Sequence, residues 1–419
     1  MATMAPASLS WTERILNAVD AVAERVVAAS HSIHAHPEVA FQEHHASALL
    51  AGELEQGGFR VTRGIGGLET AFLAELAGAA PGPTVAVLAE YDALPELGHG
   101  CGHNVIGAAA LGAGLALAAT AGEFAGRLVV IGTPAEERVG GKILLGEAGV
   151  FDDVDAAIMV HPATRTMVDR GSLAHSRCEI IFHGKAAHAA TSPDQGINAL
   201  DAVIQTFVGI NARRPHMRAD AKIHGIITHG GDAPNVIPAR ASALFVVRAL
   251  DRDYQRTLAK MLRDVAEGAA LATGARLEWI ERRGCANFVP NKVLGETMAR
   301  RLRELGLPVI PAPDDGKMGS TDMGDISQLV PSLHAFITMA PPGTPGHSVE
   351  LRAVAASEAG DRAALDAAKC LAMTAADLLT DPTLVDRAKA EYQDALAAGR
   401  VAGWEAWHAS AERYTPYVL

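Results

Sequence analysis

Residues 84–104, TVAVLAEYDALPELGHGCGHN, join a strand-like segment to a loop rich in potential metal ligands. The β-branched, apolar run at 84–92 is typical of a buried strand. The loop after it places Cys101 and His103 among glycines, and a run rich in Ala and Gly continues from Val105 to Ala121. That run falls short of the roughly 20 strongly apolar residues of a membrane span, so we expect a buried helix there.

Short apolar segments of the same kind recur along the chain. They are RLVVIG at 127–132, DAAIMV at 155–160 and HAFITMA at 334–340, with helix-like sequence between them. Residues 12–30 predict an amphipathic helix, and a second helix is expected to stop at Gly57 and Gly58. Strands that alternate with helices predict an α/β domain, in which a mostly parallel central sheet is covered by helices on both faces.

The region 176–287 has a different pattern. Its segments predict strand, helix, strand, strand, helix, strand, which is the order of a ferredoxin-like α+β unit. We therefore expect a small domain at 176–287, inserted into a larger domain made of 1–175 and 288–419. The 419 residues are too many for one ordinary core, which agrees with two domains.

Composition argues against several classes of partner and location. The net charge of -12 is unlike that of a nucleic-acid-binding protein, which usually carries a basic patch. The four cysteines are scattered, so they predict no disulfide framework and fit a reducing cytoplasm. The N-terminus lacks the basic start and apolar core of a signal peptide. We expect a cytoplasmic protein with no nucleic-acid or membrane partner.

Polar side chains gather where the predicted strands end. In an open parallel sheet, ligands bind outside the carboxyl ends of the strands. Four such ends supply Cys101 and His103, Glu136 and Glu137, His161, and His347. Each of these signals alone is weak, since a Cys-x-His pair or a paired glutamate is often incidental. Together they predict a metal site at one edge of the sheet.

The number of ligands fits two ions. With the Cys101 thiolate and a hydroxide shared between them, His103, Glu137, His161 and His347 divide two and two, so each ion is four-coordinate, as zinc prefers. A pair of ions about 3.5–4 Å apart is a known arrangement for hydrolysis. The mixed sulfur, nitrogen and oxygen set favours Zn, with Mn or Co as alternatives.

Glu136 has a different expected role from its neighbour Glu137. It cannot easily join the same ion as Glu137, so we interpret it as the general base that takes a proton from water.

The motifs HAHPEVAFQE, YDALPELGHGCGHN, GTPAEE, GGDAPNVIPARA and GTPGHS occur in this order. Together they resemble the co-catalytic metallopeptidases that include aminoacylase, carboxypeptidase G and the indole-acetyl-amino-acid hydrolases. The GCGHN form and GSTDMGDIS at 319–327 are most similar to the branch of aminobenzoyl-glutamate hydrolase and its acyl-dipeptidase relatives.

The resemblance implies a phosphorylase/hydrolase-like catalytic domain whose inserted domain acts as a lid and forms a homodimer. It implies the same five ligands and the same base. It also implies that His188 polarises the scissile carbonyl in the partner subunit's site, that Asn235 holds the carbonyl oxygen, and that Arg248 binds the substrate carboxylate. Without the resemblance, His188 could be a loop histidine, Asn235 a turn former and Arg248 a solvated strand end.

Three nearby residues need separate interpretation. Some peptidase branches have His-x-Asp where this chain has Glu90, Tyr91 and Asp92. Glu90 is therefore not assigned as a ligand, and Asp92 is expected to support the ligands from behind. His99 is interpreted as a surface residue, with a supporting hydrogen bond to the site as the alternative.

The implied reaction is hydrolysis of the amide bond in an N-acyl amino acid, an aminobenzoyl-glutamate-like conjugate or a dipeptide. One alternative is a carbamoyl, ureido or xenobiotic amide substrate. Another is a metabolite-binding relative without catalysis, although a complete set of ligands and a base argues against it. The acyl group, the leaving amino acid and the native metal stay open.

Overall fold

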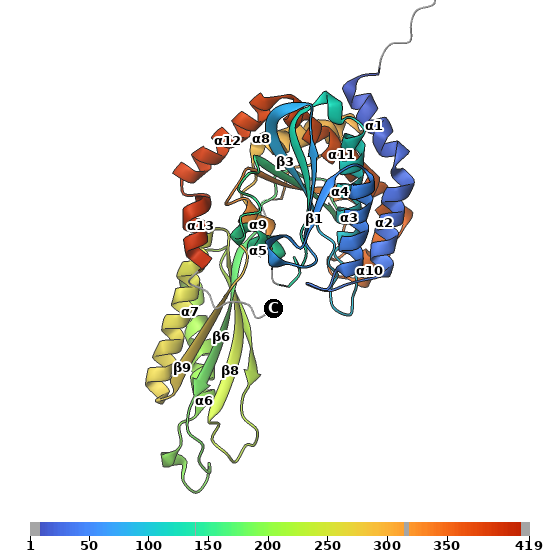
Figure 1. Cartoon of the computed structure of the whole chain (residues 1–419). Helices are drawn as coiled ribbons and strands as arrows, with labels where there is room; N and C mark the ends of the chain where they lie inside the picture. The colour runs from blue at the N-terminus through green and yellow to red at the C-terminus, as the bar shows by residue number, and fades with distance from the viewer. Residues whose placement is uncertain (1–8, 139, 314–317, 412–419) are drawn as a thin grey trace, which may run out of the picture. The chain divides into compact units, whose positions relative to one another are not determined.

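The computed structural model describes residues 9–138, 140–313 and 318–411, without the side chain of Ala411. Part of the segment on which the signal-peptide expectation rests, residues 1–8, lies outside this range. The chain divides into two compact units, drawn in Figure 1. The first consists of Met1–Gly171, Val289–Asp315 and Asp325–Gly403, and the second of Ser172–Phe288, Gly316–Gly324 and Trp404–Leu419.

The first unit is built on a six-stranded mixed sheet. Its order is β1 (Arg60–Arg63), β2 (Phe72–Ala77), β4 (Ala125–Gly132), β3 (Ala80–Ala89), β5 (Ala156–Ala163) and β10 (Ser332–Thr338). The strands β4, β3, β5 and β10 are parallel, as the sequence predicts, and β2 joins β4 and β1 antiparallel. The β3 strand ends at Ala89, before the predicted position 92, so Glu90 to Asp92 lie just beyond the sheet.

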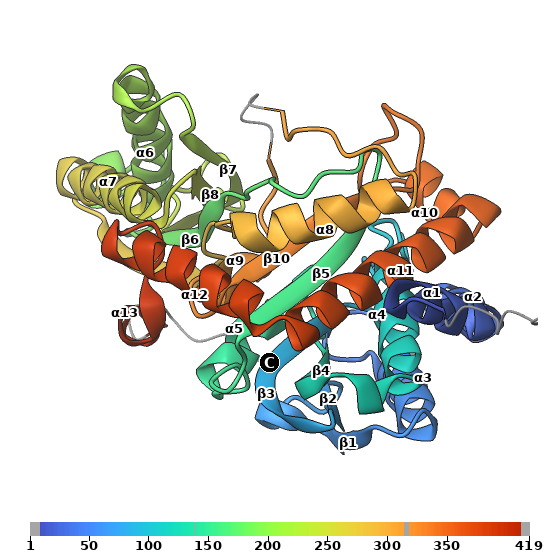
Figure 2. The ribbon, with the colours of Figure 1, turned by 90° about the horizontal axis from the view of Figure 1, so that it is seen from above.

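Helices cover this sheet and bury its apolar strands. They are α1 (Trp11–Ala21), α2 (Ala23–Ala35), α3 (His44–Gln56), α4 (His103–Ala118), α5 (Gly141–Glu147), α8 (Lys292–Glu304), α10 (Val349–Ala355), α11 (Glu358–Thr380) and α12 (Pro382–Ala397), with α9 (Met323–Ile326) where the chain passes from one unit to the other. α4 and α11 pack on each other and on β3, β4 and β5. Figure 2 shows α8 and α11 running across β5 and β10.

The structure confirms one of the predicted helices and divides another into two. α4 is buried over nearly its whole length, which confirms the buried helix. Among the described residues, every helix is too short or too polar to cross a lipid bilayer. The helix predicted at 12–30 is two helices, because the backbone leaves helical geometry at Val22 (φ -106°, ψ 7°). α1 starts with a capping box in which Ser10 and Glu13 satisfy each other's backbone N–H groups.

The second unit contains a four-stranded antiparallel sheet. Its order is β7 (Lys222–His229), β8 (Arg240–Ala249), β6 (Ala174–His183) and β9 (Arg276–Arg283). Along the chain, α6 (Ala199–Arg213) follows β6 and α7 (Arg252–Thr273) follows β8, and the two helices pack together. α13 (Gly403–Ala411) ends the described chain, and short 3-10 turns lie at Ile65–Gly67, Ala121–Glu123, Pro193–Gln195 and Arg214–His216.

Candidate metal centre

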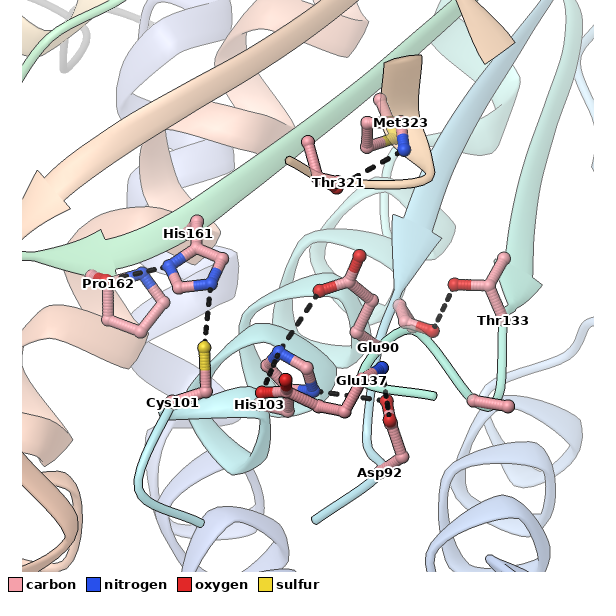
Figure 3. Close-up of polar contacts among 12 residues, drawn as sticks. Glu90, Asp92, Cys101, His103, Thr133, Glu137, His161, Pro162, Thr321 and Met323 are labelled. Carbon is pink, nitrogen blue, oxygen red and sulfur yellow. Dashed lines mark hydrogen bonds and ion pairs between the residues drawn. The ribbon is translucent and has the colours of Figure 1, made fainter. Parts of the chain in front are cut away.

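The five predicted ligands lie together at the carboxyl ends of the parallel strands. Together with the candidate base, they form three overlapping clusters, and within each cluster the donor atoms all lie within 4.8 Å of one another. The clusters are Cys101, His103 and His161; Cys101, Glu137 and His347; and His103, Glu136 and Glu137. Figure 3 shows the side chains of Cys101, His103, Glu137 and His161 converging from the loop after β3, the start of α4, the turn after β4 and the end of β5.

Gly102 explains how the two predicted ligands Cys101 and His103 can flank one residue at the start of α4. Its backbone is left-handed (φ 86°), and a Cβ at this position would lie 2.7 Å from Cγ of Pro162. A side chain at this position is therefore excluded by both strain and space. The glycine lets the loop approach β5, where His161 lies, and then begin the helix at His103.

His103 presents one ring nitrogen to the centre of the site. Its Nδ1–H donates to Oδ1 of Asp92 over 3.1 Å. Its Nε2 lies 3.8 Å from Oε1 of Glu137 and 3.5 Å from Oε2 of Glu90. These three facing atoms are buried, and no hydrogen bond to any described residue satisfies them. Buried polar atoms are rarely left without partners. A cation between Nε2 of His103 and Oε1 of Glu137 would satisfy both of these atoms, so the two residues fit a metal ion.

His161 and Cys101 form the other side of the centre. The Nδ1–H of His161 donates to the carbonyl oxygen of Pro162 over 2.7 Å, which directs Nε2 to Sγ of Cys101, 3.4 Å away. Burial and the nearby His103 lower the pKa of His161 to about 4, so its imidazole is in the neutral, ligating form. Burial raises the pKa of the Cys101 thiol to about 12. Binding a cation there must therefore displace a proton.

His347, the fifth predicted ligand, lies in the loop after β10. Its Nε2 is 3.4 Å from Oε1 of Glu137, and its ring is 55% exposed, the most open of the five side chains. The backbone of His347 is left-handed (φ 53°), and its N–H donates to the carbonyl oxygen of Gly100 over 3.1 Å. This contact ties the His347 loop to the loop that carries Cys101.

The turn after β4 carries the candidate base and a candidate ligand side by side. Ala135 has a left-handed backbone (φ 62°), which is uncommon for a residue other than glycine. The N–H of Glu137 donates to Oδ2 of Asp92 over 3.0 Å. Asp92 thus supports both Glu137 and His103, in agreement with its predicted supporting role.

Glu90 forms a buried ion pair that the sequence interpretation missed. Its Oε1 lies 2.5 Å from Nζ of Lys142, and both side chains are almost fully buried. Burial opposes ionisation, but Lys142 and then His103 outweigh it and lower the pKa of Glu90. A lysine in the first turn of the apolar helix GKILLGE is the sequence signal for such a pair. The pair places a buried carboxylate, balanced by the charge of Lys142, next to the centre.

The prediction that His99 is a surface residue is wrong. Its side chain is only 1% exposed, and its ring lies 6.0 Å from that of His34 on α2. Arg352 of α10 also contacts this loop, since it donates to the carbonyl oxygen of Leu97 over 3.2 Å. His99 is buried because segments distant in the sequence pack around it. The polarity of the local sequence does not reveal such packing.

The remaining predicted residues lie in the second unit. His188 is exposed, and its Nδ1 accepts backbone N–H groups of Ala190 and Thr191, each over 3.2 Å. His188 lies beside the segment of exposed Asn235, whose carbonyl oxygen accepts from the N–H of Ala189 over 3.0 Å. Arg248 is half-buried on β8, and its Nη1 donates to Oγ of Ser320 over 3.3 Å.

Comparison with known proteins identifies a family. A model of peptidase family M20/M25/M40 matches residues 86–354. The chain is 37% identical over 397 residues to the Xaa-Arg dipeptidase of Mus musculus, with 91% of both chains covered. It is 31% identical over 452 residues to one of the subunits of the p-aminobenzoyl-glutamate hydrolase of Escherichia coli (strain K12), covering 90% of this chain and 94% of that one.

A solved structure shares the fold. The dinuclear metal-binding M20 peptidase of Bacillus subtilis superimposes with a TM-score of 0.68 at 22% identity, covering 86% of this chain and 99% of that one. The family match extends over more than half of the chain, and the two relatives are similar along nearly all of it. The chain therefore belongs to peptidase family M20/M25/M40 and is a metal-dependent hydrolase of amide or peptide bonds.

Proposed function

We propose that Cys101, His103, Glu137, His161 and His347 hold two divalent cations, and that the enzyme cleaves the amide bond of an N-acyl amino acid or dipeptide with a free carboxylate. The observation that carries the proposal is the group of buried, facing atoms without hydrogen-bond partners, Nε2 of His103 and Oε1 of Glu137. The donor set of one thiol, three imidazoles and one carboxylate suits Zn, with Mn or Co as alternatives.

Side chains of the protein transfer the protons and hold the ligands in position. When bound, the cations supply Lewis-acid chemistry that polarises the amide carbonyl and makes water more acidic. Glu136 belongs to the same cluster as His103 and Glu137, so its carboxylate can take the proton of the attacking water and pass it to the leaving amine. Asp92 keeps Glu137 and His103 in place during this transfer.

His188 is suited to stabilise a developing oxyanion. Since its Nδ1 accepts two backbone N–H groups, a neutral ring carries its proton on Nε2, which is then a donor on an exposed loop. We assign Asn235, in the adjoining segment, to the carbonyl oxygen. Arg248 can form a bidentate pair with a carboxylate, which would select substrates with a free amino-acid end.

We propose that 176–287 is a ferredoxin-like lid domain and that it forms a homodimer, with His188 acting in the partner subunit's site. Exposed apolar side chains support this. Ile226 and Ile227 are 64% and 45% exposed on the edge strand β7, and Val208 is 62% exposed on α6. An edge strand with exposed apolar residues is a ready pairing surface. Hinges near residues 175 and 288 would let the lid close.

A hydrolysis screen tests the substrate class. The enzyme, loaded with Zn, Mn or Co, is incubated with para-aminobenzoyl-glutamate, β-alanyl dipeptides including one ending in arginine, N-acetyl amino acids and N-carbamoyl amino acids. We expect release of the amine from at least one acyl or dipeptide substrate, and much weaker release from the same substrate with its carboxylate amidated. Preferential cleavage of the carbamoyl compounds would favour the ureido alternative instead.

A further inference from the structure

Glu43 is a buried carboxylate that the proposed reaction does not use. It lies at the start of α3, and its side chain is fully buried. Its Oε2 accepts the hydroxyl of Thr70 over 2.8 Å, and its Oε1 accepts the backbone N–H of Ala135 over 2.9 Å. The second bond reaches across 92 residues of sequence to the turn after β4. That turn carries Glu136 and Glu137.

The position of Glu43 shows that it is not needed as a helix cap. It occupies the N-cap position of α3, where a side chain ordinarily accepts an N–H from the first helical turn. Its side chain makes no such bond. Glu38 accepts the N–H groups of His45 and Ala46 instead, over 2.8 and 3.0 Å. The Glu43 carboxylate is therefore free to bind the distant turn.

The turn needs an external support. Ala135 has φ 62°, a conformation that costs energy for a residue with a Cβ and persists only when its surroundings enforce it. A hydrogen bond from the N–H of Ala135 to a buried side-chain oxygen can enforce this conformation. Glu43 supplies this bond on one side of the turn, and Asp92 holds the N–H of Glu137 on the other.

We infer that Glu43 is a positioning residue for the metal centre, which fixes the left-handed backbone of Ala135 and thereby aims Glu136 and Glu137. The inference rests on the proposed metal centre. Glu43 touches neither the substrate nor the cations. Removal of the Glu43 side chain is therefore expected to change the turn after β4. The changed turn would weaken metal binding by Glu137 and displace the carboxylate of Glu136.

Metal affinity measured apart from activity tests the inference. Zn²⁺ binding to the full-length protein is measured by competition with a chromogenic chelator. Glu43→Ala should bind Zn²⁺ on the order of 10- to 100-fold more weakly, as expected for lost support behind a ligand. Glu43→Gln should stay close to wild type, because its carbonyl can accept from Ala135 and its NH₂ group can donate to Thr70.

Three further variants separate positioning from general stability. Glu38→Ala removes the neighbouring carboxylate that caps α3, so it should lower the melting temperature without changing Zn²⁺ affinity. In Glu43→Asp, the side chain is too short to reach both Thr70 and Ala135. This variant replaces Glu43→Ala in the test if the alanine variant does not fold, and it should also weaken Zn²⁺ binding. Ala135→Gly in the Glu43→Ala background should restore part of the affinity, since glycine adopts φ 62° without strain.

Unchanged Zn²⁺ affinity in Glu43→Ala and Glu43→Asp would overturn the inference. So would an equal loss in Glu38→Ala, or a loss in Glu43→Ala that Ala135→Gly leaves undiminished. A wild-type protein that binds none of Zn²⁺, Mn²⁺ and Co²⁺ would instead overturn the proposed function, and the two failures are therefore distinguishable.

Discussion

Glu136→Gln is expected to keep both cations and to lose nearly all turnover. The amide has the shape of the carboxylate but cannot take a proton from water, so kcat should fall on the order of 10²- to 10⁴-fold, the usual contribution of a general base. Glu136 lies with His103 and Glu137 in one cluster, while Glu137 also joins the cluster of Cys101 and His347. The five proposed ligands do not include Glu136.

The measurement pairs steady-state kinetics with metal analysis on the same preparation. Asp386→Asn is the matched control, since it makes the same change from carboxylate to amide at an exposed position of α12. It should retain wild-type kcat and metal content. If Glu136→Gln turned over substrate at a rate near wild type, Glu136 could not be the base. If it lost metal, Glu136 would be a ligand.

His188→Ala is expected to reduce kcat on the order of 10²- to 10³-fold, the cost of removing one oxyanion donor. Its proposed action in the partner's site makes a stronger prediction. When His188→Ala and Glu136→Gln are unfolded and refolded together, each mixed dimer contains one intact site, with Glu136 from one chain and His188 from the other. Recovery to about a quarter of wild-type activity is then expected for random pairing in a twofold dimer.

Each variant refolded alone provides the baseline for this mixing experiment. His216→Ala, which removes another exposed histidine of the second unit, is the matched control and should keep full activity. Mixed samples that stay as inactive as the separate variants would show that His188 does not serve a partner's site. Size-exclusion chromatography of the mixture establishes that dimers have formed.

Strong periodic signals made the parallel core predictable from sequence. The short apolar runs at β3, β4 and β5 are typical of buried strands, and the helix-like sequence between them indicates a parallel arrangement. β1 and β2 were not predicted, because Arg60–Arg63 is short and mostly exposed and shows no apolar alternation. The break at Val22 was missed because both halves share an amphipathic pattern.

The candidate centre was predictable where strand ends bring residues together. The ligands follow consecutive parallel strands, so topology alone places them at one edge. The supporting contacts of Glu43 and His99 were not predictable, and the lysine in the apolar segment GKILLGE indicated a buried ion pair for Lys142 but not its partner. They depend on how α2, α3 and α5 pack against distant turns, and one chain carries no signal for such pairings.

A crystal structure of the protein soaked with Zn²⁺, with anomalous data at the zinc edge, tests the metal centre most directly. We predict two anomalous peaks per chain, about 3.5–4 Å apart, with Sγ of Cys101 between them and the side chains of His103, Glu137, His161 and His347 around them. Fewer than two peaks, or ligand side chains that point away from one another after soaking, would contradict the account.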